Sequence, residues 1–367
     1  MKRVVLISGH PLRSPRRAGF HWLAEAYGRL GWDVLFITAS ISRLSRLRRD
    51  RRLACLSPGE AGRLRALRPG LWSFVWYTAW HPANLRLGLL NRLTCGWFAR
   101  YGDLPLGEAE PWVRQADLVI FESTPGMMLL PQVRRLSPQA RCVYRVSDDM
   151  RVLRNHPAVL EAEERLAGAF DLVSVPSRAL LERFGRLPRA ALHHHGIARE
   201  LFDRPHEDPY GPGPRPRCLF VGSAMFDRDF LARASEALPE WVFHVIGPIG
   251  RLPRRPNVVA HGERPFAETV PFLVHADIGL QTLVYAPGAE CFTDSLKVLQ
   301  YTWCRLPMVA PEFLRCGREH MFHYRPGDTA GIVAALRAAA AFDRRRILRD
   351  GIRSWEELAA TLADEGG

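Results

Sequence analysis

The sequence predicts an α/β protein with two Rossmann-like domains of comparable size. Its 367 residues are too many for one small core and suit two domains. The chain opens with a strand–loop–helix–strand pattern, and a second series of strand patterns follows a segment rich in proline and glycine. These observations predict two parallel, doubly wound sheets with a cleft between their carboxyl ends.

The first half begins with RVVLISGH, residues 3–10, where β-branched residues lead into a small polar turn. GFHWLAEAYGRLG (19–31) predicts a helix closed by Gly31, and WDVLFIT (32–38) predicts the next strand. This β–α–β order is the usual start of a parallel sheet. Three later segments predict further strands: DLVIFES (117–123), RCVYRVS (141–147) and DLVSVPS (171–177).

The linker prediction rests on RPHEDPYGPGPRPR, residues 204–217, whose proline, glycine and charge content cannot sustain a helix or a strand. The predicted divisions are an N-terminal domain (1–205), a linker (206–217), a C-terminal domain (218–345) and a helical tail (346–367) able to pack back on the N-terminal domain. Strands of the second domain are predicted in CLFVGSAM, WVFHVIG, NVVAHGE, DIGLQTL and LPMVAP.

The net charge of +13 is unevenly distributed. Residues 1–100 carry 18 basic and 4 acidic side chains, whereas the remainder carries 33 basic and 34 acidic ones. The excess therefore predicts an anionic partner for the first half: nucleic acid, an anionic membrane face or a charged substrate.

Cellular location is predicted from what the sequence lacks. No uninterrupted apolar run is long enough to span a bilayer, and no secretory signal precedes the first strand. The seven cysteines are scattered and form no C-x-x-C pair, which indicates reduced thiols in the cytosol rather than disulfides or a zinc site.

Lysine occurs only at Lys2 and Lys297, and every other basic residue is arginine. The segment PGAECFTDSLKVLQY predicts a loop followed by a helix, with Thr293 or Asp294 as its N-cap and Lys297 in its first turn. A cation there opposes the helix dipole, whereas a bound anion would pair with both the ammonium and the exposed N–H groups. Gln300 shares that face. The hypothesis is a diphosphate site, and the alternative is a solvated surface lysine.

Two further motifs follow predicted strands. VYRVSDDM places Asp148 and Asp149 just beyond a strand end, where either could act as a general base or cap the following helix. FVGSAMFDRDFL is a strand, a turn and a helix, so the backbone can approach a ligand closely at Gly222 and Ser223.

Residues 40–56, SISRLSRLRRDRRLACL, place Ile41, Leu44 and Leu47 at helical spacing among arginines. This is typical of an amphipathic segment on anionic lipid, and the aromatic stretches LWSFVWYTAW and CGWFARY could enter an interface. The alternatives are an ordinary buried strand and helix beside a solvated arginine face, or nucleic-acid binding, for which no helix-turn-helix, zinc-finger or RNP-type motif is found. A dinucleotide-dependent oxidoreductase is disfavoured because the first loop lacks G-x-G-x-x-G.

Taken together, these segments resemble the xanthan-type glucuronosyltransferases. The resemblance runs through RSPRRAGFH, SRLSRLRRDRRL, FES, VYRVSDDM, VGSAMFD, FHVIG, HGE and DSLKVLQY. It implies an inverting GT-B enzyme that transfers glucuronate from UDP-glucuronic acid to a lipid-linked (polyprenyl pyrophosphate) oligosaccharide in exopolysaccharide synthesis. It also implies no metal or other cofactor, no nucleic-acid partner, and a cytoplasmic enzyme peripheral to the inner face of the cell membrane.

The resemblance also assigns roles to residues. The general base falls on Asp148, although the family has glycine where this chain has Asp149. A methionine of the uridine pocket falls on Ala224, beside Met225, and the donor-site tyrosine falls near Leu283, close to Tyr285. The donor site implied is Gly222, Ser223, Met225, Glu263, Tyr285, Asp294, Ser295, Lys297 and Gln300, with Glu263 near the ribose. The acceptor- or membrane-facing arginines implied are Arg13, Arg16, Arg17, Arg43, Arg46, Arg48, Arg49, Arg51 and Arg52.

Two other functions are compatible with the sequence. One is a GT-B transferase that uses another nucleotide sugar and a soluble acceptor. The other is a non-catalytic nucleic-acid-binding protein.

Overall fold

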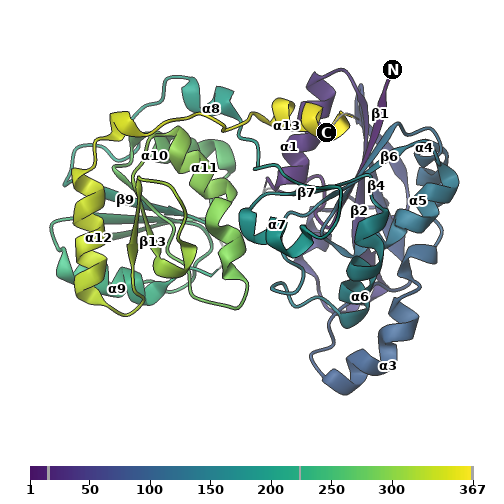
Figure 1. The fold of residues 1–367 in the computed structure, drawn as a ribbon, viewed down its shortest axis with the longest axis horizontal. Coiled ribbons are helices and arrows are strands. Elements are labelled where there is room, and N and C mark those ends of the chain that lie inside the picture. Colours follow the sequence, from purple (N-terminus) through teal and green to yellow (C-terminus); the bar gives the residue numbers. More distant parts are fainter. Residues whose placement is uncertain (15–16, 223–224, 365–367) are drawn as a thin grey trace. The chain divides into compact units, whose positions relative to one another are not determined.

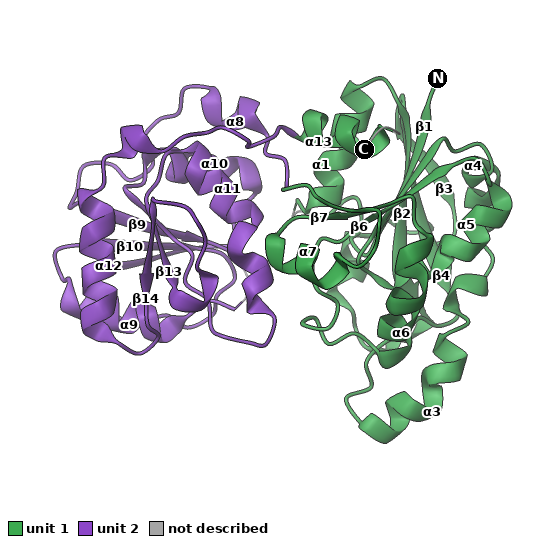
Figure 2. Ribbon diagram, viewed as in Figure 1, with its two compact units in different colours: residues 1–194, 355–367 green, residues 195–354 purple. Residues whose placement is uncertain are grey.

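The computed structural model describes residues 1–14, 17–222 and 225–364 (Figure 1). The chain forms two compact units, Met1–His194 with Trp355–Gly367 and His195–Ser354 (Figure 2). The first unit ends earlier than residue 205, so the segment 206–217 lies within the second unit rather than between the two. The last helix, α13 (Trp355–Ala363), belongs to the first unit, where the Tyr27 hydroxyl donates to the Ala359 carbonyl oxygen at 2.9 Å.

Unit 1 is built on an eight-stranded sheet in the order β3-β4-β2-β1-β5-β6-β7-β8. Its pairings are parallel apart from the antiparallel pair β3–β4. The strands are β1 Arg3–Ser8, β2 Asp33–Ser42, β3 Leu64–Arg68, β4 Leu71–Thr78, β5 Leu118–Glu122, β6 Arg141–Arg145, β7 Leu172–Val175 and β8 Ala190–Leu192.

Helices cover both faces of this sheet. The strand order reverses direction at β1, and because parallel crossovers are right-handed, α1 lies on one face while α5 and α6 lie on the other (Figure 2). The α-helices are α1 Gly19–Arg29, α2 Arg43–Leu47, α3 Gly88–Phe98, α4 Glu110–Val113, α5 Leu130–Leu136, α6 Pro157–Leu166 and α7 Arg178–Phe184. Short 3-10 helices are η1 Arg51–Cys55, η2 Tyr101–Asp103, η3 Gly107–Ala109, η4 Pro125–Leu129 and η5 Ala167–Ala169.

Unit 2 repeats the architecture with a parallel six-stranded sheet in the order β11-β10-β9-β12-β13-β14. Its strands are β9 Arg217–Val221, β10 Val242–Ile246, β11 Val258–Gly262, β12 Ile278–Leu280, β13 Met308–Pro311 and β14 Met321–Tyr324. Its helices are α8 Arg199–Asp203, α9 Arg228–Ala237, α10 Phe266–His275, η6 Ala289–Asp294, α11 Leu296–Trp303, η7 Glu312–Leu314, α12 Thr329–Ala341 and η8 Arg344–Arg346. One core lies beneath α9 and α12, and a second lies beneath α10 and α11.

The predicted strands of both units are confirmed, and most have a buried centre, whereas β11 at the edge of its sheet is half-buried to exposed. Val4 to Ile7 of β1 are fully buried, as expected for a strand covered on both faces. Gly31 ends α1 with a φ of 79°, a conformation that favours glycine.

Residues 40–56 do not form one amphipathic helix, and the structure supports the alternative of an ordinary buried strand followed by a short helix. Strand β2 continues through Ile41, which is buried, past an irregularity in its pairing with β4 after Thr38. Only the five residues of α2 are α-helical before η1 begins. The neighbouring stretch LWSFVWYTAW forms β4, whose Phe74 and Trp76 are buried, so these two rings are core residues.

Candidate functional site

Three neighbouring strands of unit 1 end around one acidic group. The order β1-β5-β6 places Ser8, Glu122 and the segment after β6 at the same edge of the sheet. The Ser8 hydroxyl and the Gly9 N–H both donate to Glu122 Oε2, at 2.6 and 3.0 Å, while His10 Nε2 lies 4.0 Å from Glu122 Oε1. Glu122 thus holds the loop that follows β1.

Asp148 lies beside this carboxylate. Ser123, the residue after β5, accepts hydrogen bonds at its hydroxyl from the backbone N–H groups of Ser147 and Asp148, at 3.0 and 3.1 Å. Burial, together with the negative charge of Glu122, raises the pKa of Asp148 to about 6, against a smaller opposing effect of His10. A carboxyl group with this pKa is largely ionised at pH 7 yet basic enough to accept a proton.

Asp149 has different surroundings. Its side chain is buried and forms ion pairs with Arg151 at 2.7 Å and Arg183 at 3.0 Å, and Arg183 also pairs with Glu163. Burial alone would raise the pKa of Asp149, but the hydrogen bonds from Arg151 and the charge of Arg183 lower it below its usual value. Asp149 is therefore held in an ion-pair network and does not share the environment of Asp148.

The alternative that Asp148 or Asp149 caps the following helix is wrong. The next helix, α6, is capped by His156, whose ring accepts a hydrogen bond from the Ala158 N–H. Asp149 instead accepts from the Arg151 N–H at 2.9 Å and stabilises a turn.

In unit 2, the ends of β9, β10 and β11 meet through glycines. The Gly247 N–H donates to the Gly262 carbonyl oxygen at 2.7 Å, and a Cβ atom on Gly247 would overlap the Gly222 carbonyl oxygen. Only glycine permits this approach, and Gly247 also has a φ of 139°. The loop carrying Glu263, which is exposed, is thereby joined to the loop carrying Gly222.

The side chain of Lys297 extends toward Gly222, the residue that follows β9. Lys297 is the second residue of α11, in the first turn as predicted, and its Nζ lies 4.0 Å from the centre of the Phe220 ring. A Cβ atom on Gly222 would lie 3.5 Å from that Nζ. Burial lowers the pKa of Lys297 to about 7, and no ion pair of Lys297 is found among the described residues. The ammonium is poised to gain an anionic partner.

The predicted N-cap of α11 is wrong by one or two residues. Ser295 occupies the N-cap position without a side-chain capping hydrogen bond, because η6 continues through Thr293 and Asp294. The Ser295 hydroxyl accepts a hydrogen bond from Gln281 Nε2 at 3.1 Å, whereas the Asp294 carboxylate accepts from Arg318 at 2.5 Å. The carboxylate of Asp294 is thus engaged by Arg318.

The other predicted donor-site residues that the structure describes also lie on unit 2. Gln300 is buried one turn further along α11, and Met225 has a φ of 55° and accepts at its carbonyl oxygen from the Val284 N–H. Tyr285 is 57% exposed, with its ring 5.3 Å from that of Phe313. Ser223 lies outside the described residues.

Some of the predicted acceptor- or membrane-facing arginines of unit 1 contact other residues of the chain, and others are exposed. Arg52 donates to the carbonyl oxygens of Gly9 and Ser40, both at 2.8 Å. It thereby stabilises the loop after β1 and the irregular part of β2. Arg13, Arg17 and Arg46 contact Ser57, Glu25 and Tyr77, respectively. The remaining described members are exposed: Arg43, Arg48, Arg49 and Arg51. Arg16 lies outside the described residues.

Glu122 and Gly247 were not among the predicted site residues. Glu122 carried a signal, since it is an acidic side chain at the end of an otherwise apolar strand pattern. Gly247 also follows a strand pattern, but its contact with Gly222 depends on the order of the strands in the sheet.

The described residues contain neither a cluster of metal ligands nor a membrane-spanning helix. No group of three or more histidine, cysteine, aspartate or glutamate side chains among them could hold a metal ion. Within the same residues, no helix has the length and apolar character needed to cross a membrane.

Comparison with known proteins adds independent findings. A family model described as "Glucuronosyltransferase GumK, N-terminal domain" matches residues 6–176. A UDP-glucuronate:glycolipid 2-beta-glucuronosyltransferase from Xanthomonas campestris pv. campestris is 30% identical over 364 residues, which cover 98% of this chain and 89% of the relative.

Solved structures resemble the whole chain. Sucrose-phosphate synthase from Thermosynechococcus elongatus has a TM-score of 0.67 at 16% identity, covering 99% of this chain and 97% of its own. The Anabaena protein HepE in complex with UDP and glucose has a TM-score of 0.61 at 13% identity, covering 100% and 96%. These neighbours show the fold alone, and they confirm the predicted GT-B class.

Proposed function

Because the chain belongs to the family of the glucuronosyltransferase GumK and is a glycosyltransferase of GT-B fold, we propose that it transfers glucuronate from UDP-glucuronic acid to a glycolipid. The name of the Xanthomonas relative, which specifies UDP-glucuronate and a glycolipid, supports this choice of donor and acceptor. In the proposed reaction the glycolipid is an oligosaccharide linked to a polyprenyl diphosphate at the inner membrane face.

Asp148 is the proposed general base. The oxygen of an acceptor hydroxyl attacks the anomeric carbon, its proton passes to the Asp148 carboxylate, and the bond to the diphosphate oxygen breaks in a single displacement. The raised pKa of Asp148 and its position beyond β6 support this role. Asp149 is a poor alternative because Arg151 and Arg183 already pair with it.

Lys297 is the proposed partner of the departing UDP. The leaving group carries away the electron pair of the broken bond, so its diphosphate gains negative charge that a nearby ammonium and the N–H groups of a helix N-terminus stabilise. This arrangement can supply the positive charge locally, and we therefore expect turnover in the presence of a metal chelator. The buried ammonium of Lys297 beside Gly222, on a residue that is half-buried as a whole, is the observation that carries the proposal.

Turnover of a panel of UDP-sugars tests the proposed donor. We expect UDP-glucuronic acid to be hydrolysed slowly alone and transferred to a glycolipid acceptor, at a rate at least tenfold above those of UDP-glucose and UDP-galactose. Preferential use of an uncharged UDP-sugar with a soluble acceptor would instead establish a different transferase. UDP should also raise the melting temperature, and its failure to do so would contradict a nucleotide site.

The acidic limb of the pH–rate profile tests the electrostatic effect of Glu122 on the pKa of Asp148. Activity should fall as pH drops below about 6, because protonated Asp148 cannot accept a proton. Glu122→Gln removes a neighbouring negative charge, so it should lower the pKa of Asp148 and move this limb to lower pH. The profile of kcat/KM measures the shift. An unmoved limb, with the variant folded, would contradict the coupling.

Binding to vesicles tests the proposed membrane-facing arginines. Changing Arg43, Arg49 and Arg51 to glutamine should weaken binding to anionic vesicles about tenfold or more at low salt, since each contributes roughly 1 kcal/mol near such a surface. Removing the same charge from exposed arginines of unit 2, Arg254, Arg325 and Arg337, is the matched control. Equal losses in the two triple variants would indicate a net-charge effect and contradict a specific membrane face.

A further inference from the structure

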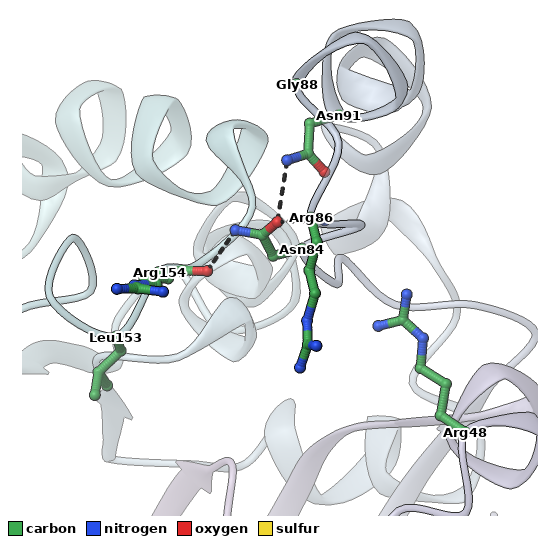
Figure 3. A pocket seen from close by; sticks show the side chains of 7 residues that line it. All are labelled: Arg48, Asn84, Arg86, Gly88, Asn91, Leu153 and Arg154. Carbon is green, nitrogen blue, oxygen red and sulfur yellow. Dashed lines mark hydrogen bonds between the residues drawn. The ribbon is translucent and has the colours of Figure 1, made fainter.

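A basic pocket of about 860 Å³ lies in unit 1, and none of the residues that line it is assigned a role in the proposed chemistry (Figure 3). Its guanidinium groups come from three separate parts of the chain: Arg48 after α2, Arg86 before α3, and Arg154 in the loop before α6. The remaining lining is Asn84, Gly88, Asn91 and Leu153, so no carboxylate lines the pocket.

The three guanidinium groups are not matched by acidic side chains. In the described part of the chain, many arginines of unit 1 pair with a carboxylate, as Arg63 does with Glu108 and Arg134 with Asp171. No such ion pair is found there for Arg48, Arg86 or Arg154, and all three are exposed. Guanidinium groups bind phosphate oxygens in bidentate geometry, so three around one pocket favour a polyanionic phosphate ligand.

Hydrogen bonds between the lining loops hold the pocket in shape. Asn84 Nδ2 donates to the Arg154 carbonyl oxygen at 2.8 Å, and Asn91 Nδ2 donates to Asn84 Oδ1 at 3.1 Å (Figure 3). The backbones of Arg86 and Arg154 both have positive φ, 64° and 51°. Residues other than glycine rarely adopt this conformation. The loops that present these two arginines are thus fixed by bonds to each other.

A second pocket of about 330 Å³ adjoins the first and shares Asn84, Leu153 and Arg154 with it. It extends to Gly9 and His10, and His10 is the residue 4.0 Å from Glu122. A ligand with its phosphates in the basic pocket could therefore extend its sugars toward the strand ends around Asp148.

Helix α3 begins at the pocket wall and has an apolar outer face. Leu89, Leu93 and Trp97, spaced four residues apart, are 71%, 71% and 52% exposed, and Leu90 lies beside them. On its inner face Cys95 contacts Glu161 of α6, and Phe98 contacts His156, the N-cap residue of α6. Large apolar side chains clustered on the exposed face of one helix beside arginines are typical of a helix that lies in a membrane interface.

We propose that the basic pocket binds the diphosphate group of the lipid-linked acceptor while the outer face of α3 lies in the acyl region of the membrane. The proposal rests on the proposed function, since it identifies how the acceptor of that reaction is recognised. Charge complementarity selects the diphosphate, and the adjoining apolar helix face selects a lipid rather than a soluble phosphate ester.

Vesicle binding by the full chain tests the proposal without requiring turnover. One set of phosphatidylcholine vesicles contains a polyprenyl diphosphate, and the other contains phosphatidylglycerol at equal total charge. The unaltered protein should bind the diphosphate vesicles at least tenfold more tightly. The double variant Arg86→Gln, Arg154→Gln should lose this preference and still bind the phosphatidylglycerol vesicles.

Matched controls separate the possible results. The double variant Arg100→Gln, Arg135→Gln removes exposed charge elsewhere in unit 1 and should keep the preference. An equal loss of affinity for both vesicle types in the Arg86→Gln, Arg154→Gln variant would overturn the proposal. Binding of inorganic diphosphate to the pocket as tightly as the lipid would also overturn it. Leu93→Ser should weaken binding to both vesicle types, and unchanged binding would remove α3 from the interface.

The proposed function can fail independently of this inference. If UDP-glucuronic acid supports no transfer but the diphosphate preference and its loss are observed, the pocket stands and the reaction is different. If transfer of glucuronate to the glycolipid is observed without any preference for diphosphate vesicles, the reaction stands and the pocket assignment fails.

Discussion

Asp148→Asn is expected to reduce kcat for transfer by about 10²- to 10⁴-fold, the range that loss of a general base produces. Asparagine keeps the size of the side chain and cannot accept the proton of the attacking hydroxyl. The backbone N–H of residue 148 can still donate to Ser123, so the loop should keep its shape. The affinity for UDP, measured by calorimetry, should stay within about twofold of the unaltered protein.

Asp149→Asn is the matched control for this experiment. The substitution leaves Arg183 without one of its two carboxylate partners in a buried network, so it should lower the free energy of unfolding by about 3 kcal/mol. Measured below its melting temperature, the variant should keep most of its kcat. Retained turnover in Asp148→Asn, or full loss in a folded Asp149→Asn, would contradict the assignment of the base.

Lys297→Met is expected to weaken the affinity for UDP-glucuronic acid by about 30- to 100-fold, since a hydrogen bond to a charged group contributes about 2–3 kcal/mol. Methionine fills similar space against the Phe220 ring and carries no charge. The other lysine, Lys2, lies over the Trp32 ring in unit 1, so Lys2→Met removes one ammonium from a comparable aromatic contact. The Lys2 variant should bind the donor normally.

Lys297→Met should stabilise the folded chain even though it weakens donor binding. Because burial lowers the pKa of Lys297 to about 7, the folded chain binds fewer protons than the unfolded chain between pH 7 and the ordinary lysine pKa. The contribution of Lys297 to the free energy of unfolding therefore rises with pH in this window. Lys297→Met should be more stable by roughly 1 kcal/mol at pH 7 and below, and this advantage should shrink above pH 7. A less stable variant at pH 6 would contradict a buried, unpaired ammonium.

The strands and the edges at which functional groups gather could be predicted from the sequence, because apolar runs are local signals. RVVLIS and RCVYR form strands, and parallel strands with a common direction place their following residues at one edge. Lys297 was placed in the first helical turn because the loop and the helix pattern meet a few residues before it.

Features that depend on distant partners could not be predicted. Asp148 and Asp149 are adjacent, and the sequence did not distinguish them, because Asp149 is engaged by Arg183, which is 34 residues further along the chain. Ile41, Leu44 and Leu47 match a helical period, but pairing with β4 keeps Ile41 in a strand. In the same way, Arg48, Arg86 and Arg154 meet in one pocket only after the loops before α3 and α6 bond to each other.

Proton uptake on donor binding tests most directly the claim that Lys297 holds the diphosphate. Calorimetric titration of UDP-glucuronic acid at pH 8, in buffers of different ionisation enthalpy, measures the protons taken up for each molecule bound. Lys297 is mostly neutral at that pH and must be protonated to pair with the diphosphate, so uptake close to one proton is expected, and Lys297→Met should abolish it. No uptake by the unaltered protein, or equal uptake by the variant, would contradict the claim.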